Sequence, residues 1–196
     1  MAFHYWQDMA SPDFGALDGD RTVAVLLLCA TEQHGPHLPT GTDTMIARGL
    51  TEEVARRFSG DFDLIFLPAL AIGASEEHAR FSGTLSVSTP LLIEQISAIG
   101  AQVAAGGLKN LVLVSSHGGN VAAMTAAALA CRQQHGLLAV TLTWSRLGLP
   151  PGLVDADERA AGIHGGFVET SLMLHFRPDL VQMDKAADFD SLQSDL

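Results

Sequence analysis

Short apolar runs alternate with segments of helical pattern along this chain, and this alternation constrains the fold more than any other feature. The run at 22–29 is continuous and rich in Val and Leu, which is typical of a strand buried on both faces of a sheet. Further strands are expected at 63–70, 84–87, 110–115 and 137–144. Strands separated by helices predict a mostly parallel sheet with helices on both faces.

Helices are expected at 43–58, 90–106, 120–136 and 167–176. Asp43 is suited to cap the first of them, Pro90 occupies the first position of the second, and Pro178 stops the last. In folds of this class, ligands bind just beyond the carboxyl ends of the strands. Polar residues that directly follow a strand are therefore the first candidates for a functional site.

Length and charge narrow the class of protein. The chain has 196 residues, of which 47% are hydrophobic, so one domain with a substantial core is expected, and no composition shift marks a second domain. The formal net charge is −11 and Lys plus Arg number only 11. Nucleic acids and anionic membrane surfaces both need a basic face, so neither is an expected partner.

The cysteines and the N-terminal residues indicate no special compartment. Cys29 and Cys131 each lie in an apolar stretch without a CxxC pair, which predicts two buried free thiols. Residues 1–21 lack the basic start and apolar core of a secretory signal. The apolar run at 23–30 is too short to span a bilayer. A soluble cytoplasmic protein is expected.

Three loops carry the residues that bear chemistry. Glu32 and His34 follow the first strand, Asp43 begins the helix after them, His117 follows the 110–115 strand, and Glu169 lies at the start of the last helix. Three carboxylates and two imidazoles form a ligand set that suits Zn, Mn or Fe rather than a thiolate-preferring metal. Because these loops lie at predicted strand or helix ends, we expect one metal site assembled from distant parts of the chain.

The number of ligands points to two metal ions. Five protein ligands are one too many for a tetrahedral zinc with an open position. They match two ions that share a bridging carboxylate, as in hydrolases whose ions lie roughly 3.5–4 Å apart and activate a shared water. Asp43 is the expected bridge, because it sits between the other ligands of the first loop and the helix start. Taken alone, Asp43 also fits a simple helix cap.

Other residues near these loops have open roles. Gly118 and Gly119 leave room for a ligand or substrate to approach the backbone. His78 either lines the pocket or faces solvent. His37 either belongs to the functional site or has a purely structural role. Structural roles are expected for His4, His135 and His175. A phosphate-binding role for residues 115–120 is weaker, because the segment lacks the Lys and glycine spacing of a P-loop.

The same residues resemble the motifs of the creatininase (creatinine amidohydrolase) family. The run Thr-Glu-Gln-His-Gly-Pro-His-Leu-Pro at 31–39, followed by Asp43, resembles the first motif, and His-Gly-Gly-Asn at 117–120 resembles the second. Residues 73–84, which include Glu77-His78 and Phe-Ser-Gly-Thr, resemble the middle segment. His-Gly-Gly-Phe-Val-Glu-Thr-Ser at 164–171 resembles the third motif, so the likeness extends from residue 31 to residue 181.

The resemblance implies a three-layer α/β/α sandwich and a two-metal centre that hydrolyses C–N bonds, non-peptide or peptide-like. It carries the ligand roles onto Glu32, His34, Asp43 and His117. Creatininase itself has an acidic residue where this chain has Gly119, so the chain is more similar to members in which Glu169 supplies the last ligand. His164 matches a histidine that acts on substrate, and Glu169 is its catalytic neighbour. The implied assembly is a homo-oligomer, commonly a hexamer.

Two departures from the family bear on the substrate. Residues 145–163 contain no Trp, whereas creatininase closes tryptophans over a small flat substrate. Family members also continue beyond the point where this chain stops, so residues 1–196 are expected to be one domain lacking the C-terminal segment. A small amide or a short modified peptide is the expected substrate. The alternatives are a peptidase-like or formamide-hydrolysing enzyme of cofactor biosynthesis, and a non-catalytic metal-binding protein.

Overall fold

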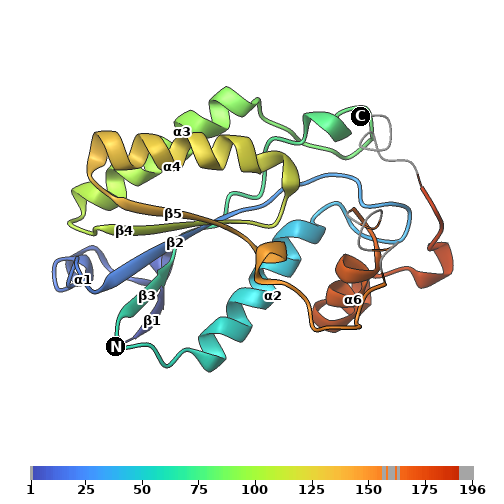
Figure 1. The fold of residues 1–196 in the computed structure, drawn as a ribbon, viewed down its shortest axis with the longest axis horizontal. Coiled ribbons are helices and arrows are strands. Elements are labelled where there is room, and N and C mark those ends of the chain that lie inside the picture. Colours follow the sequence, from blue (N-terminus) through green and yellow to red (C-terminus); the bar gives the residue numbers. More distant parts are fainter. Residues whose placement is uncertain (1, 156–157, 159–161, 163, 190–196) are drawn as a thin grey trace.

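The computed structural model describes residues 2–155, 158, 162 and 164–189. Its centre is a five-stranded sheet with the order β1-β3-β2-β4-β5, and every neighbouring pair is parallel (Figure 1). The strands are β1 Phe3–Tyr5, β2 Thr22–Leu28, β3 Asp63–Phe66, β4 Asn110–Ser115 and β5 Leu138–Thr143. The predicted parallel α/β architecture is confirmed.

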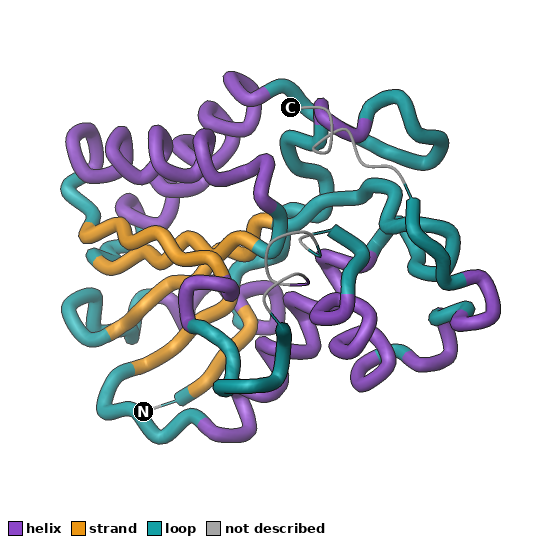
Figure 2. The backbone as a smooth tube through the Cα atoms, turned by 45° about the vertical axis from the view of Figure 1, so that its right-hand side comes forward, coloured by secondary structure: helices purple, strands orange, loops and turns teal. Residues whose placement is uncertain are grey.

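Helices cover both faces of this sheet. The longer ones are α2 Thr42–Arg57, α3 Thr89–Ala105, α4 Val121–His135 and α6 Phe167–Phe176, and a short α1 spans Ser11–Phe14. Helices α3 and α4 lie together on one face, and α2 and α6 lie together on the other side (Figures 1 and 2). No helix among the described residues is long and apolar enough to cross a membrane.

The alternation of side chains along β2 explains why both faces need a cover. Leu26 and Leu28 are fully buried in the core beneath α3 and α4, together with Leu92 and Ile96 of α3. Val25 and its β2 neighbours on the opposite face belong to the core beneath α2. Successive strand residues point to opposite faces, so a continuous apolar run serves two cores at once.

The prediction of two buried free thiols is confirmed. Cys29 and Cys131 are free and buried. Cys131 lies at a close approach of α4 to α3, because a Cβ added at Gly100 would stand 2.5 Å from the Cys131 sulfur. The small side chains of the alanine-rich α4 allow this approach.

Four elements differ from the prediction. Strand β3 ends at Phe66 instead of residue 70, just before Pro68, which has no backbone N–H to donate to a neighbouring strand. The expected strand at 84–87 is only an isolated bridge between Thr31 and Leu85. Strand β1 and helix α1 were not predicted, because β1 has only three residues and exists through its pairing with β3.

Strand register brings the candidate loops together. Strands β2 and β4 pair from Val23 with Asn110 to Leu28 with Ser115, so both end at the same level of the sheet. Ser116 continues the ladder by donating its N–H to the Leu28 carbonyl at 3.0 Å. The loops that follow β2 and β4 therefore leave the sheet side by side.

Candidate metal centre

The polar side chains that follow β2 and β4 converge in the interior of the protein. Glu32 and His34 come from the loop after β2, and His117 comes from the loop after β4. Asp43 lies in the first turn of α2, and Glu169 lies in the first turn of α6. Glu32, His34 and Asp43 are 0%, 1% and 2% exposed, which is rare for charged groups unless they are paired or bind a metal.

One group of donors surrounds His34. Its Nε2 atom lies 3.8 Å from Asp43 Oδ1 and 3.9 Å from Glu169 Oε2. One ligand atom from each of these three residues falls within 4.8 Å of the others, close enough for a single ion. The structure thus brings together three sequence-predicted residues from two separate helices and a loop.

A second group surrounds His117. Its Nδ1 atom lies 3.0 Å from Glu32 Oε1, and its Nε2 atom lies 3.2 Å from Glu77 Oε1. Ligand atoms of Glu32, Glu77 and His117 also fall within 4.8 Å of one another. Glu77 was not among the predicted site residues, although it belongs to the middle segment 73–84, where sequence reasoning singled out only His78.

Asp43 connects the two groups. Its Oδ1 atom faces His34 Nε2 at 3.8 Å, and its Oδ2 atom faces His117 Nδ1 at 3.9 Å. Asp43 therefore presents one oxygen to each histidine. This is the arrangement that a carboxylate shared by two ions requires.

Backbone carbonyls orient both histidines. His34 Nδ1 lies 3.1 Å from the Glu32 carbonyl, and His117 Nε2 lies 3.0 Å from the Ala74 carbonyl. A carbonyl only accepts hydrogen bonds, so these nitrogens donate, and the neutral rings carry lone pairs on His34 Nε2 and His117 Nδ1. Those two atoms face the carboxylates, as expected for metal ligands held by an outer partner.

Several potential metal-ligand atoms in this cluster have no hydrogen-bond partner. Both carboxylate oxygens of Glu32, His34 Nε2 and Asp43 Oδ2 are buried and accept no hydrogen bond of normal geometry. Each unsatisfied buried polar atom costs about 1–3 kcal/mol. Divalent cations held by the two groups would satisfy these atoms, and the carboxylate and imidazole ligands suit Zn, Mn or Fe. The residues therefore fit a metal centre.

The charges of the cluster shift its pKa values strongly. Burial raises the pKa of Glu32, but the close contact and charge of His117, together with the charge of His34, outweigh burial and lower it to about 2. Burial lowers the pKa of His34, yet Asp43 and Glu169 raise it to about 9. The pKa of His117 likewise rises to about 11 against burial, through Glu32 and Glu77. Without a cation, both histidines hold protons at neutral pH.

His164 stacks against the cluster. Its ring centroid lies 4.2 Å from that of His78 and 4.4 Å from that of His34. Its Nε2 donates to the Gln33 carbonyl at 2.6 Å, which leaves Nδ1, 3.8 Å from Glu32 Oε1, with a lone pair. Burial, followed by His34 and His78, lowers the pKa of His164 to about 4, so the ring is neutral at pH 7.

His78 and Glu169 complete the surroundings of His164. His78 is only 1% exposed, and its Nε2 lies 4.0 Å from Glu32 Oε1, so it faces the cluster rather than solvent. Glu169 Oε2 accepts the Gly165 N–H at 2.5 Å. Burial raises the pKa of Glu169 to about 7, although the charge of His34 opposes the shift.

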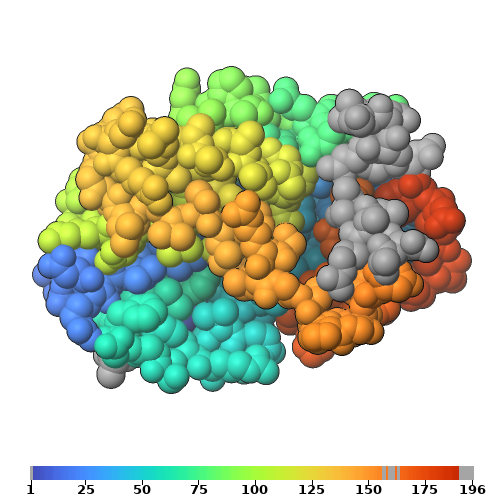
Figure 3. All heavy atoms as spheres, in the orientation of Figure 1, coloured from blue at the N-terminus to red at the C-terminus, as the bar shows by residue number. Residues whose placement is uncertain are grey.

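The two glycines of the second motif lie in different surroundings. A Cβ at Gly119 would stand 2.5 Å from both Glu77 Oε1 and His117 Nε2, so the Glu77 carboxylate occupies the space beside it. A Cβ at Gly118 would meet no atom within 4 Å. Both glycines border a groove of about 830 Å³ along α4, whose surface is yellow in Figure 3.

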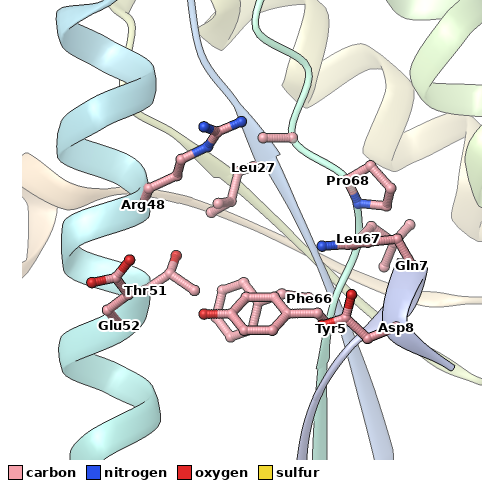
Figure 4. A pocket seen from close by; sticks show the side chains of 11 residues that line it. Tyr5, Gln7, Asp8, Leu27, Arg48, Thr51, Glu52, Phe66, Leu67 and Pro68 are labelled. Atoms are coloured by element: carbon pink, nitrogen blue, oxygen red, sulfur yellow. The ribbon is translucent and has the colours of Figure 1, made fainter.

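Two other features lie outside the cluster. His37 Nε2 bonds Thr170 Oγ1 at 2.9 Å, which ties the first loop to α6 and supports its structural reading. A second pocket, of about 590 Å³, lies between α2 and the ends of β1 and β3 (Figure 4). Tyr5 and Phe66 line it on one side and Arg48 on the other, and no cluster residue contributes to its wall.

Known proteins resemble this chain in sequence. A precursor peptide peptidase for mycofactocin from Mycolicibacterium smegmatis is 37% identical over 158 residues, which are 80% of this chain and 58% of that relative. The chain therefore spans less than two thirds of the length of this relative.

Known structures resemble it in fold. A creatininase structure designated Mn is 25% identical with a TM-score of 0.80, and the match covers 95% of this chain and 77% of the other. A variant creatininase of the Zn-Zn type has a TM-score of 0.79 at 25% identity and covers 94% and 77% of the two chains. The sequence also matches the creatininase family, described as creatinine amidohydrolase, over residues 7–196. With the motif residues gathered at one site, the chain belongs to the creatininase family.

Proposed function

We propose that the protein is a metal-dependent amidohydrolase that cleaves a C–N amide bond with water activated at a two-metal centre. The single observation that carries this proposal is the set of buried ligand atoms on Glu32, His34 and Asp43 that make no hydrogen bond. The proposed ligands are Glu32, His34, Asp43, His117 and Glu169, with Asp43 as the bridge. Zn and Mn are the proposed ions, supported by the Mn and Zn-Zn creatininase structures, and Fe suits the same donors.

Such ions, when bound, polarise the amide carbonyl and lower the pKa of a coordinated water from about 15.7 toward about 7. In the proposed reaction the water oxygen attacks the carbonyl carbon, and the C–N bond then breaks. His164 Nδ1, whose lone pair faces Glu32, accepts the proton released by the water and delivers it to the leaving nitrogen. The products are a carboxylic acid and an amine, so the step needs no other reactant.

We propose a small amide or a short modified peptide as the substrate, with hydrolysis of a peptide-derived amide supported by the 37% identity to a precursor peptide peptidase. The test is a panel of creatinine, formamides and short peptides, assayed with metal-depleted and metal-restored protein. Hydrolysis of a panel member that is lost on chelation and restored by Mn or Zn is expected. Tight metal binding without any hydrolysis would instead favour the non-catalytic alternative.

Glu77 provides a prediction about the second group. Its carboxylate and the Ala74 carbonyl both face His117 Nε2, so Glu77 would hold the tautomer that leaves Nδ1 for the metal. Loss of such an outer partner costs about 10- to 100-fold in metal affinity. We expect Glu77→Gln to weaken metal binding by this factor in a chelator competition, and Glu76→Gln, at an exposed neighbour, to leave it unchanged. Equal affinities for both variants would contradict the assignment.

Metal uptake should depend on pH in a defined direction. The raised pKa values of His34, about 9, and His117, about 11, mean that both rings are protonated at pH 7 and must lose a proton to become ligands. Glu169, with a pKa of about 7, adds a partial proton. Affinity should therefore rise with pH up to about 11, the pKa of His117, with about two or more protons released at pH 7. Calorimetry in buffers of different ionisation enthalpy measures this number, and zero release would refute the prediction.

We also propose a homo-oligomer, as the family resemblance implies, and the cytoplasmic location stays a prediction. Large apolar side chains are exposed on α4 and β5, with Leu129 at 54% and Leu138 at 59% exposure. Exposed apolar surface of this kind favours association. Light scattering at several concentrations tests the proposal, which a constant mass of 20.7 kDa would contradict.

A further inference from the structure

The first and third motif loops meet at a pair of glycines. Gly35 directly follows His34, and Gly165 directly follows His164. Both adopt left-handed backbone conformations, with φ of 73° and 62°, which glycine tolerates without strain. A Cβ at Gly165 would lie 3.2 Å from the His34 carbonyl oxygen, so the two loops are in close contact.

One aromatic ring fills the space that these glycines leave. A Cβ at Gly35 would collide with Phe189, and a Cβ at Gly165 would stand 2.5 Å from Phe189 Cζ. The ring is also edge-to-face with His164, with centroids 6.2 Å apart, and 6.3 Å from His37. Phe189 therefore contacts both motif loops at the residues next to two histidines of the cluster.

The segment after α6, which leads to Phe189, contacts the first loop at residues 181 and 182. Gln182 donates its backbone N–H to the His37 carbonyl at 2.9 Å. Val181 packs against the small core formed by Leu38, Ile46 and Met173. These contacts hold residues 181 and 182 against the first loop, seven residues before Phe189.

We propose that Phe189 is a positioning residue that clamps the first and third motif loops together and so fixes His34 against His164. The inference rests on the proposed function, because it assigns to Phe189 the alignment of a ligand with a proton carrier. An aromatic contact of this kind corresponds to about a threefold to tenfold change in an equilibrium or rate. Loosening the clamp should affect both metal retention and turnover.

The first measurement does not depend on hydrolysis. The Zn-loaded full chain is mixed with excess EDTA, and release of the metal is followed over time. Phe189→Ala is expected to release Zn about three to ten times faster than the unaltered protein, and Phe189→Tyr, which keeps the ring, should restore the slow rate. Phe167→Ala, which removes a half-exposed ring from the start of α6, is the matched control and should change nothing.

The second measurement separates positioning from general stability. With a substrate found in the amide panel, Phe189→Ala should lower kcat about threefold to tenfold with little change in KM, and Phe189→Tyr should recover it. Phe189→Leu should give an intermediate rate of metal release if the alanine variant folds poorly. Identical release rates for the folded alanine variant and the unaltered protein would overturn the proposal. If no amide is cleaved, the proposed function fails, while the release rates still decide the role of Phe189.

Discussion

Replacing Glu32 with Gln is expected to abolish tight metal binding. Both oxygens of this carboxylate are buried without hydrogen bonds, and Oε1 lies 3.0 Å from His117 Nδ1. An amide is neutral and turns one of the two acceptors into an NH₂ donor, which a cation repels. The affinity for Zn or Mn should fall by more than the roughly 100-fold that loss of an outer partner costs, because Glu32 is proposed as a direct ligand.

Elemental analysis after gel filtration, together with chelator competition, measures this effect. Glu76→Gln is the control, since it makes the same chemical change at an exposed residue near the site. The circular dichroism of both metal-depleted variants should match that of the unaltered protein if only binding is lost. A Glu32→Gln protein that retained its full metal content would show that the ions, if present, bind elsewhere.

The place where these side chains cluster could be predicted from the sequence because it depends on strand order and buried runs. Continuous apolar strands predicted a parallel sheet, and parallel strands end at one edge. The register of β2 with β4 then places Glu32 and His34 beside His117, as expected. Asp43 and Glu169 were predicted from their positions in the first turns of helices, where the structure places them.

Glu77 escaped prediction because a non-local scaffold determines its place. The 3-10 turn Glu76–His78 has no periodic pattern that predicts its orientation. Asn120 holds the preceding segment by accepting the Ala74 N–H at 2.9 Å while donating to the Cys29 carbonyl at 3.0 Å. Neither hydrogen bond can be predicted from the sequence, because each joins residues that lie far apart in the chain. The same reason left the environment of His78 open between pocket and solvent.

Element ends were harder to predict than element types. The apolar pattern continues to residue 70, but Pro68 interrupts the ladder and β3 stops at Phe66. The segment at 84–87 has a strand-like composition, yet its pairing with Thr31 is an isolated bridge and not a ladder. Pairing partners, which lie far away in sequence, decide such cases. The role of Phe189 is of the same kind, since it depends on two glycines from separate loops.

His164 is the residue for which we expect the largest loss of turnover without loss of metal. Its Nε2–H is committed to the Gln33 carbonyl at 2.6 Å, so only Nδ1 is free to exchange a proton with substrate. The pKa of about 4 keeps the ring neutral, which is the form that accepts a proton from water. Removal of a general acid–base group lowers rates by about 10²- to 10⁴-fold, and we expect a fall in kcat of this size for His164→Ala.

Metal content decides between the two roles open to His164. Its Nδ1 also falls in a group with Glu32 and His34 that is compact enough to hold an ion. A proton carrier predicts that His164→Ala keeps its full complement of Zn or Mn while kcat falls. A ligand predicts that metal and activity are lost together. His175→Ala, at an exposed residue of α6, should change neither quantity. Three carboxylates, from Glu32, Asp43 and Glu169, already face His34 and His117, so the proposed ligand set is complete without His164. The geometry therefore favours His164 as the proton carrier. Joint loss of metal and activity would reverse that assignment.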